Sequence, residues 1–171
     1  TLALTGEAEL RSWADVIQVG GFAYRTGEGA FFQANTAVAG LLVEGVLAAL
    51  APASGEHVLD LYCGVGLFTL PVGQRVAEIV GVESNSTAAA DAVHNIAAAG
   101  VRGRIINQDV AEALRSPELA GQGWDAIILD PPRTGVDGSA LEALAALGAA
   151  RLLYISCEPS TLARDLRILS D

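Results

Sequence analysis

A chain of 171 residues, of which 51% are hydrophobic, is long enough to bury one core, and it contains no apolar run of membrane-spanning length. Twenty acidic against ten basic residues give a net charge of -10, which argues against a domain that holds nucleic acid through a basic face of its own. Two cysteines are too few for a disulfide framework, so we expect reduced thiols in a cytoplasmic protein, which we take to be a monomer.

The first part of the chain, residues 1–50, differs in pattern from the rest and predicts a hairpin followed by a helix. Residues 16–32 read as a hairpin around Thr26-Gly27-Glu28-Gly29, and Asn35 can cap the helix after it. The apolar positions of that helix follow helical spacing: Val38, Leu41, Leu42, Val46 and Ala49. Phe31-Phe32-Gln33, just before the helix, fits either a core edge or a ligand contact.

Residues 51–171 alternate strand-length apolar runs with helical patterns, as a nucleotide-binding core would. Five runs are predicted as strands: Val58 to Tyr62, Glu78 to Glu83, Arg104 to Gln108, Asp125 to Asp130 and Leu152 to Ser156. Several are continuously apolar, which is typical of strands buried on both faces. A helix is predicted from Ser86 to Ala99, ending at Gly100. The fold class is therefore α/β, with a doubly wound, mostly parallel sheet of the Rossmann-like type.

The first of these strands runs into a glycine pair, in Asp60-Leu61-Tyr62-Cys63-Gly64-Val65-Gly66. Such a turn lets the backbone approach a ligand, although a glycine pair by itself is a weak signal. The third glycine of the dinucleotide fingerprint is missing, and Glu83 closes the next strand about 20 residues on, where a carboxylate can hold ribose hydroxyls. The pattern favours S-adenosylmethionine over a nicotinamide cofactor. Asp109 could meet the adenine, or be a solvated loop acid.

The fourth strand delivers Asp130-Pro131-Pro132-Arg133-Thr134-Gly135, in which two prolines restrict the backbone and hold Asp130 and Arg133 in place. Ligands of an open parallel sheet bind outside the carboxyl ends of its strands. The pattern places five candidates at that edge: Asp60, Glu83, Asp109, Asp130 and Cys157.

Cys157 follows the last apolar run, and Pro159 then opens an amphipathic helix. A thiol between a strand end and a helix start is exposed enough to act as a nucleophile. The alternative is a small apolar plug, because free cysteine is among the most often buried residue types.

These motifs together resemble those of the RNA uracil-C5 methyltransferases, which make 5-methyluridine in tRNA and rRNA. The resemblance covers residues 15–171 and is carried by Phe31-Phe32-Gln33, the glycine loop, Asp130-Pro131-Pro132-Arg133 and Ser156-Cys157-Glu158-Pro159. It implies S-adenosylmethionine as cofactor, RNA as partner, and Cys157 as the nucleophile that adds to carbon 6 of uracil. It further implies two sets of site residues. Lining the cofactor site are Gln33, Tyr62, Gly64, Glu83 and Asp130, to which we add Asp109 for its position, and serving the uracil and catalysis are Phe31, Asp130 and Arg133.

The chain departs from the family pattern in two respects. Family members commonly have Asn where this chain has Glu158, which adds a negative charge beside the thiol. The family's general base, a glutamate, and two further strands would follow Asp171, and an RNA-binding accessory domain often precedes the catalytic one. We therefore expect a fragment of the catalytic domain that binds S-adenosylmethionine without completing turnover by itself.

Three other classes remain open. A methyltransferase acting on an exocyclic amine needs no cysteine and usually shows an aromatic residue where this chain has Arg133. A nicotinamide oxidoreductase would want the missing third glycine. A non-catalytic S-adenosylmethionine-binding module would keep Asp60 and Glu83 but has no use for a reactive thiol. No metal is expected in any of them, and the sequence does not choose between tRNA and rRNA.

Overall fold

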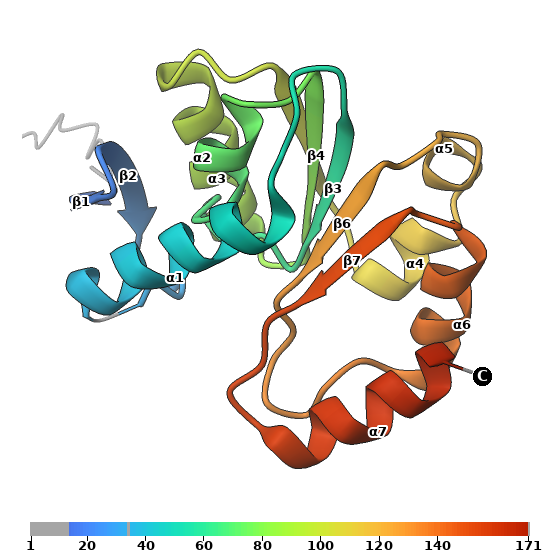
Figure 1. Ribbon diagram of the computed structural model, residues 1–171. Helices are drawn as coiled ribbons and strands as arrows, with labels where there is room; N and C mark the ends of the chain where they lie inside the picture. The colour runs from blue at the N-terminus through green and yellow to red at the C-terminus, as the bar shows by residue number, and fades with distance from the viewer. Residues whose placement is uncertain (1–13, 34, 171) are drawn as a thin grey trace, which may run out of the picture.

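The computed structural model describes residues 14–33 and 35–170, and its centre is a parallel β-sheet with helices on both faces (Figure 1). The five strands run in the order β5-β4-β3-β6-β7. Their bounds are β3 (His57–Leu61), β4 (Glu78–Glu83), β5 (Gly103–Asn107), β6 (Ala126–Leu129) and β7 (Arg151–Tyr154). The predicted doubly wound α/β class is confirmed.

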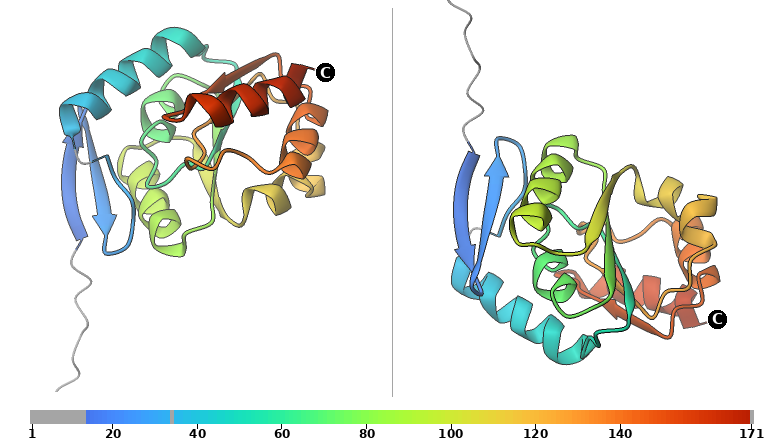
Figure 2. Two further views of the ribbon diagram at one scale, coloured as in Figure 1. Left: turned by 90° about the horizontal axis from the view of Figure 1, so that it is seen from below. Right: turned by 90° about the horizontal axis from the view of Figure 1, so that it is seen from above.

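The helices form two layers, one on each face of this sheet (Figure 2). On one face lie α1 (Thr36–Leu50), α2 (Thr69–Gly73) and α3 (Ser86–Ala98). On the other lie α4 (Val110–Leu114), α5 (Pro117–Ala120), α6 (Gly138–Ala146) and α7 (Pro159–Ser170). No helix in the described ranges is both long and apolar enough to cross a bilayer.

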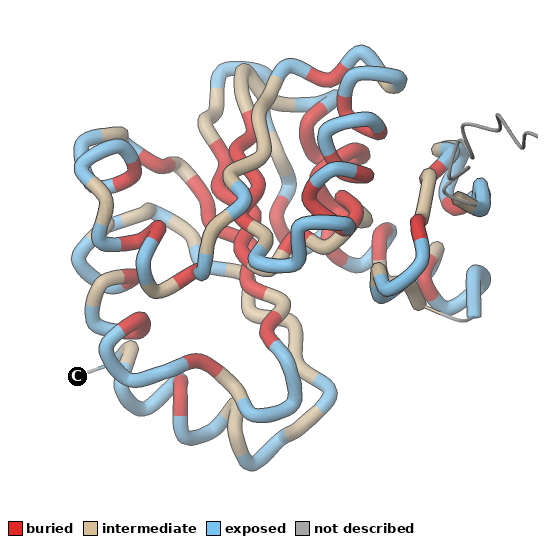
Figure 3. Tube along the Cα trace, turned by 180° about the vertical axis from the view of Figure 1, so that it is seen from behind, coloured by how far each residue is buried: buried red, intermediate tan, exposed pale blue. Residues whose placement is uncertain are grey.

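The central strands are apolar without interruption because both of their faces are covered. In β6, Ile128 packs into the core beneath α1 to α3, whereas Ile127 and Leu129 pack into the core on the opposite face. Side chains alternate between the faces of a strand, so a strand between two cores needs an apolar residue at nearly every position. Figure 3 shows this buried centre running through the middle of the molecule.

A hairpin of β1 (Ala14–Val19) and β2 (Phe22–Gly27) precedes the sheet, but its turn is not where the sequence predicted. The turn is Gly20-Gly21, with φ angles of 59° and 86°, and the predicted turn at residues 26–29 instead ends β2. Two consecutive residues with positive φ match the twist of antiparallel strands, which explains why the adjacent pair Gly20-Gly21 forms the turn. Asn35 caps α1 as predicted, accepting hydrogen bonds from the amides of Ala37 and Val38.

Two further predictions about strand ends need correction. The last strand ends at Tyr154 and not at Ser156. Beyond Tyr154, only the amide of Ile155 still bonds to the neighbouring strand, at the carbonyl of Leu129. Asp60, predicted at the open edge of the sheet, lies inside β3 and is fully buried.

Candidate functional site

The candidate site lies where the strand order reverses. From β3 the chain proceeds outward through β4 to β5, then returns to place β6 on the other side of β3. The carboxyl ends of β3 and β6 therefore form a topological switch point, the usual ligand position in an open parallel sheet. The amide of Asp130 donates to the carbonyl of Leu61 across 3.4 Å, so the segment after β6 begins beside the glycine loop after β3.

Glu83, the last residue of β4, is hydrogen-bonded to the glycine loop. The half-buried carboxylate of Glu83 accepts the amide of Gly64 at 2.9 Å and the amide of Asn85 at 2.7 Å. It thus joins the loop after β3 to the start of α3. Its Oε1 also accepts the hydroxyl of Ser84 at 3.4 Å, whereas Oε2 keeps a lone pair for a further donor. The prediction that these two strand ends act together is consistent with this geometry.

The loop backbone has a positive φ angle at three alternate positions. Tyr62, Gly64 and Gly66 have φ angles of 61°, 57° and 95°. A non-glycine residue in this left-handed region is strained, and such strain concentrates at functional sites. A Cβ built on Gly66 would lie 2.9 Å from Leu70, whereas one on Gly64 would meet no described heavy atom within 4 Å. Gly66 therefore allows close packing on α2, and Gly64 leaves space at the loop surface.

Asp60 lies beneath this loop with one oxygen free. Its Oδ2 accepts the hydroxyl of Thr69 at 2.6 Å, but its Oδ1 has no hydrogen-bond partner among the described residues. Burial raises the pKa of Asp60 to about 7, with smaller contributions from the charges of Asp130 and Glu83, while the Thr69 bond acts against the rise. A buried, unpaired acceptor is costly and calls for a ligand or a proton.

These polar groups and the space at Gly64 fit a nucleoside-containing cofactor. The carboxylate of Glu83 can accept hydrogen bonds from ribose hydroxyls, and the space above Gly64 lets a ligand meet backbone groups. Tyr62, two residues before Gly64, is half-buried against the core on the α4 to α7 side, and burial raises the pKa of its hydroxyl to about 12.

Two predicted cofactor residues are placed less directly. Asp109 is exposed after β5 and caps α4, since its Oδ1 accepts the amides of Ala111 and Glu112. Gln33 is half-buried in the segment between the hairpin and α1. The structure leaves both as predictions.

The two adjacent aromatics have separate environments. Phe32 packs into the core, with its ring centre 5.6 Å from that of Tyr24, as the structural interpretation expects. Phe31 is 78% exposed, which is unusual for a phenylalanine and leaves its ring free to stack on a ligand.

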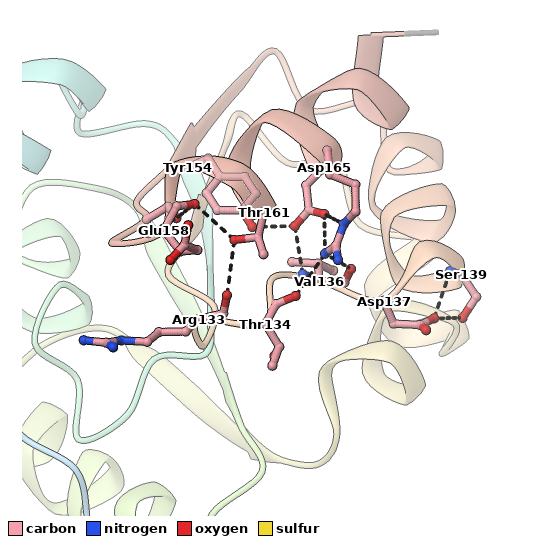
Figure 4. A network of polar contacts seen from close by, with 11 residues as sticks. Arg133, Thr134, Val136, Asp137, Ser139, Tyr154, Glu158, Thr161 and Asp165 are labelled. Atoms are coloured by element: carbon pink, nitrogen blue, oxygen red, sulfur yellow. Dashed lines mark hydrogen bonds and ion pairs between the residues drawn. The ribbon is translucent and has the colours of Figure 1, made fainter.

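The segment after β6 is tied to α7 by a polar network (Figure 4). Thr161 donates to the carbonyl of Arg133 at 3.2 Å, and Arg164 donates to the carbonyl of Thr134 at 3.0 Å. The guanidinium of Arg133 points away from these contacts and is exposed (Figure 4). Asp130, at the start of the segment, is half-buried, and burial raises its pKa to about 6.

Cys157 lies in the turn between β7 and α7 and is exposed. Ser156 closes this turn, because its Oγ accepts the amide of Glu158 at 3.0 Å and donates to the carbonyl of Glu158 at 3.1 Å. The interpretation of Cys157 as a buried plug is therefore wrong. Cys63 is the buried thiol, and burial raises its pKa well above the ordinary value.

Glu158, the departure from the family pattern, has a structural role at the start of α7. Its carboxylate accepts the hydroxyl of Ser160 at 2.8 Å and the amide of Ser160 at 3.3 Å. These bonds lower the pKa of Glu158. The side chain is therefore occupied with capping the helix that follows the thiol.

The network is organised by Asp165, which sequence reasoning missed. This fully buried carboxylate on α7 accepts the amide of Val136 at 2.8 Å and the hydroxyl of Tyr154 at 2.7 Å. Arg164 completes the set with an ion pair of 2.6 Å. A signal was present, since Asp165 follows Leu162 by three positions and precedes Leu169 by four, on the inward-facing side of the helix.

The comparisons with known proteins agree with this geometry. A family model described as tRNA (Uracil-5-)-methyltransferase matches residues 12–171. A 23S rRNA (uracil(1939)-C(5))-methyltransferase of Pseudomonas fluorescens is 44% identical over 144 residues, which are 84% of this chain and 31% of that protein. An uncharacterized RNA methyltransferase of Streptomyces avermitilis is 41% identical over 170 residues, covering 97% of this chain and 37% of that protein. The chain thus spans about a third of the length of these curated relatives.

Solved structures show the same likeness. The Pyrococcus abyssi tRNA (uracil-54, C5)-methyltransferase in complex with S-adenosyl-L-homocysteine has a TM-score of 0.77 and 28% identity, covering 91% of this chain and 37% of that chain. The T. thermophilus 16S rRNA N2 G1207 methyltransferase, in complex with AdoMet and guanosine, has a TM-score of 0.61 and 28% identity over 82% of this chain and 39% of that one.

Proposed function

The chain belongs to the tRNA (uracil-5-)-methyltransferase family, and we propose that it serves to methylate carbon 5 of a uracil base in tRNA or rRNA, with S-adenosylmethionine as methyl donor. The observation that carries the proposal is the exposed thiol of Cys157 in a turn whose following helix is hydrogen-bonded to the Asp130–Arg133 segment, at the edge that also holds the glycine loop. Methylation at carbon 5 of uracil needs an exposed thiol at this position, whereas methylation of an exocyclic amine does not.

The cofactor would be held by the glycine loop and the strand ends around it. Glu83 would accept the ribose hydroxyls, Tyr62 and Gly64 would line the space above the loop, and Gln33, Asp109 and Asp130 would complete the wall. The solved relatives named above contain S-adenosyl-L-homocysteine or AdoMet, which supports this assignment. When bound, S-adenosylmethionine supplies an electrophilic methyl group on a sulfonium.

Cys157 would make carbon 5 of uracil nucleophilic. The thiolate adds to carbon 6, forming a sulfur–carbon bond, while the electron pair of the double bond between carbons 5 and 6 moves toward the carbonyl oxygen on carbon 4 as an enolate. After carbon 5 has gained the methyl group, its proton leaves to a base, the double bond returns, and the sulfur–carbon bond breaks to release the thiolate. The thiolate is thereby regenerated with its own electron pair, the pair of the carbon 5–hydrogen bond re-forms the double bond, and the enolate pair remains in the new bond between carbon 5 and the methyl group.

Asp130 and Arg133 would stabilise the charge that develops on the uracil carbonyl oxygens. With a pKa of about 6, Asp130 holds a proton in part of the molecules near neutral pH and can donate a hydrogen bond to an oxyanion. The exposed guanidinium of Arg133 is free to pair with the same charge. Phe31 would stack on the base once it has left the RNA helix.

The decisive experiment uses a 5-fluorouridine RNA, because fluorine at carbon 5 blocks proton removal and traps the adduct. The chain is mixed with S-adenosylmethionine and two transcripts, a tRNA arm and a 23S rRNA segment, and analysed by mass spectrometry. Trypsin releases residues 152–164, in which Cys157 is the sole cysteine, so the modified thiol can be identified. We expect an adduct on this peptide that is absent from Cys157→Ala.

The two transcripts make the outcome informative about substrate as well. An adduct that persists in Cys157→Ala would contradict the nucleophile assignment. A folded chain that binds S-adenosylmethionine but forms no adduct with either RNA would favour a different methyl acceptor.

A further inference from the structure

The hairpin is attached to the core by three side chains of the α3 region. Asn85 donates to the carbonyl of Gly29 at 3.3 Å, Asp91 accepts the amide of Gly27 at 2.5 Å, and Asn95 accepts the amide of Arg25 at 2.8 Å. The hairpin leads directly into the segment that carries Phe31 and Gln33. Its attachment therefore also determines where that segment lies.

Asn95 differs from the other two because it also holds the glycine loop. Its side chain is 1% exposed, and its amide nitrogen donates to the carbonyl of Arg25 at 3.0 Å and to the carbonyl of Val65 at 2.9 Å. Val65 stands between Gly64 and Gly66. With its oxygen on the amide of Arg25, this one buried side chain uses both N–H groups and its carbonyl to bridge two segments 40 residues apart in sequence, Arg25 and Val65.

A second contact runs between the same two segments without an intermediary. The hydroxyl of Tyr24, a fully buried residue of β2, donates to the carbonyl of Leu67 at 3.0 Å. The hairpin therefore supports the loop at Val65 through Asn95 and at Leu67 through Tyr24. These contacts hold carbonyls on the inner side of the loop, while Gly64 on its outer side faces open space.

We propose that Asn95 is a positioning residue for the cofactor. By bonding to both segments, Asn95 couples docking of the hairpin to ordering of the glycine loop. Both processes then favour cofactor binding, and cofactor binding favours both processes. The inference rests on the proposed S-adenosylmethionine site. A loop already ordered in its binding conformation loses less entropy when the ligand binds. Linkage then requires that the ligand, in turn, strengthens docking of the hairpin.

Asp91 provides a matched control one helical turn away. It is 2% exposed, lies on the same helix, and its two oxygens bind the hairpin at Gly27 and at Arg25, whose Nε lies 2.9 Å away. Asn95→Ala and Asp91→Ala both weaken the hairpin attachment, but only Asn95→Ala removes a bond to the glycine loop. A difference in ligand affinity between them therefore reports on the bridge itself.

The first measurement is S-adenosylhomocysteine affinity by calorimetry, corrected for the folded fraction. We expect Asn95→Ala to weaken binding at least tenfold and Asp91→Ala to change it less than threefold. Tyr24→Phe, which removes only the hydroxyl bond to Leu67, should weaken binding threefold or more and provides the test if Asn95→Ala does not fold. Equal losses in the Asn95 and Asp91 variants, or unchanged affinity in Asn95→Ala or Tyr24→Phe, would overturn the proposal.

The second measurement is amide hydrogen exchange, which needs no enzymatic activity. Without ligand, the amides of residues 64–67 should exchange at least tenfold faster in Asn95→Ala than in Asp91→Ala. In the unmodified chain, S-adenosylhomocysteine should slow exchange at the Arg25 amide, and Asn95→Ala should abolish that effect. If the unmodified chain binds no S-adenosylhomocysteine, the proposed cofactor site fails, whereas unchanged loop exchange in Asn95→Ala overturns the bridge alone.

Discussion

At the scale of single residues, two carboxyl groups at the glycine loop, one beneath it and one beside it, have environments that oppose ionisation. Asp60 and Asp130 are both shifted upward by burial, to pKa values of about 7 and about 6. Thr69 supplies Asp60 with one hydrogen bond, but its second oxygen has none from the described residues. Because burial brings the pKa of such a group close to neutral pH, its contribution to the free energy of unfolding depends on pH.

Asp60→Asn should therefore remove a pH dependence. Between about pH 4 and pH 7 the folded chain keeps a proton on Asp60 that the unfolded chain has released, so this residue's contribution to stability falls as pH rises and levels off above its folded pKa. The free energy of unfolding of Asp60→Asn, relative to that of the unmodified chain, should therefore be about 2 to 3 kcal/mol higher at pH 8 than at pH 5, so that the variant is relatively more stable at the higher pH. Denaturant unfolding at both values tests this, and parallel pH profiles for the two proteins would contradict it.

Glu83→Ala should weaken S-adenosylhomocysteine binding by about 1 to 3 kcal/mol, through loss of charge-assisted bonds to the ribose. Glu83→Gln should fall between, because an amide keeps an acceptor for the Gly64 amide but loses the charge. Calorimetry measures both variants. Glu118→Ala, which removes an exposed carboxylate paired with Arg104, is the control and should leave the affinity unchanged. Unchanged affinity in Glu83→Ala would exclude Glu83 from the site.

At the scale of elements, α7 connects the segment bearing Arg133 to the turn bearing Cys157. Asp165 holds the amide of Val136 and the hydroxyl of Tyr154 together, and Thr161 adds the bond to the Arg133 carbonyl. Burial acts to raise the pKa of Asp165, but its hydrogen bonds outweigh that effect and leave the pKa below its ordinary value. The charged form of Asp165 is therefore what holds these elements in place.

Asp165→Asn should loosen this connection and slow reaction at Cys157. An amide cannot accept from Val136, Tyr154 and Arg164 at once, so we expect a loss of about 2 to 4 kcal/mol in the free energy of unfolding. Adduct formation with 5-fluorouridine RNA should slow at least tenfold under conditions where the variant is folded. Denaturant unfolding and timed mass spectrometry give the two values.

A control for this variant exists at the opposite end of β7. Arg151 pairs there with Glu56 and donates to the carbonyl of Leu50. Arg151→Gln should lower stability while the rate of adduct formation stays the same. If both variants slow the reaction equally, Asp165 acts only through general stability.

At the scale of the whole molecule, the charge of -10 limits how this chain can hold RNA. Nonspecific RNA affinity comes mainly from basic groups that neutralise phosphates, and this chain has an excess of acids. We expect a dissociation constant for unmodified RNA above about 0.1 mM at physiological salt. Fluorescence anisotropy with a labelled tRNA arm at two salt concentrations measures it. Micromolar affinity with a steep salt dependence would contradict this expectation and reveal a local basic surface.

Much of the fold was predictable because local pattern reflects burial. The strand-length apolar runs, several of them unbroken, predicted all five strands of the sheet, and β4 matches its predicted bounds from Glu78 to Glu83. The hairpin turn was wrong because Gly20-Gly21 and the glycines at 27 and 29 are similar turn signals in isolation. Only the pairing register between β1 and β2 decides which pair forms the turn.

The sequence by itself determined the α/β class, the glycine loop, the acids at strand ends and the placement of Cys157 before a helix, because each depends on residues close together in the chain. The tertiary structure alone decided that Cys157 is exposed while Cys63 is buried, and that Asp60 lies under the loop. It also revealed the bridges at Asn95 and Asp165, which join residues up to 70 positions apart. Hydrogen bonds over such separations leave no periodic trace in a sequence, since they depend on how complete elements pack together.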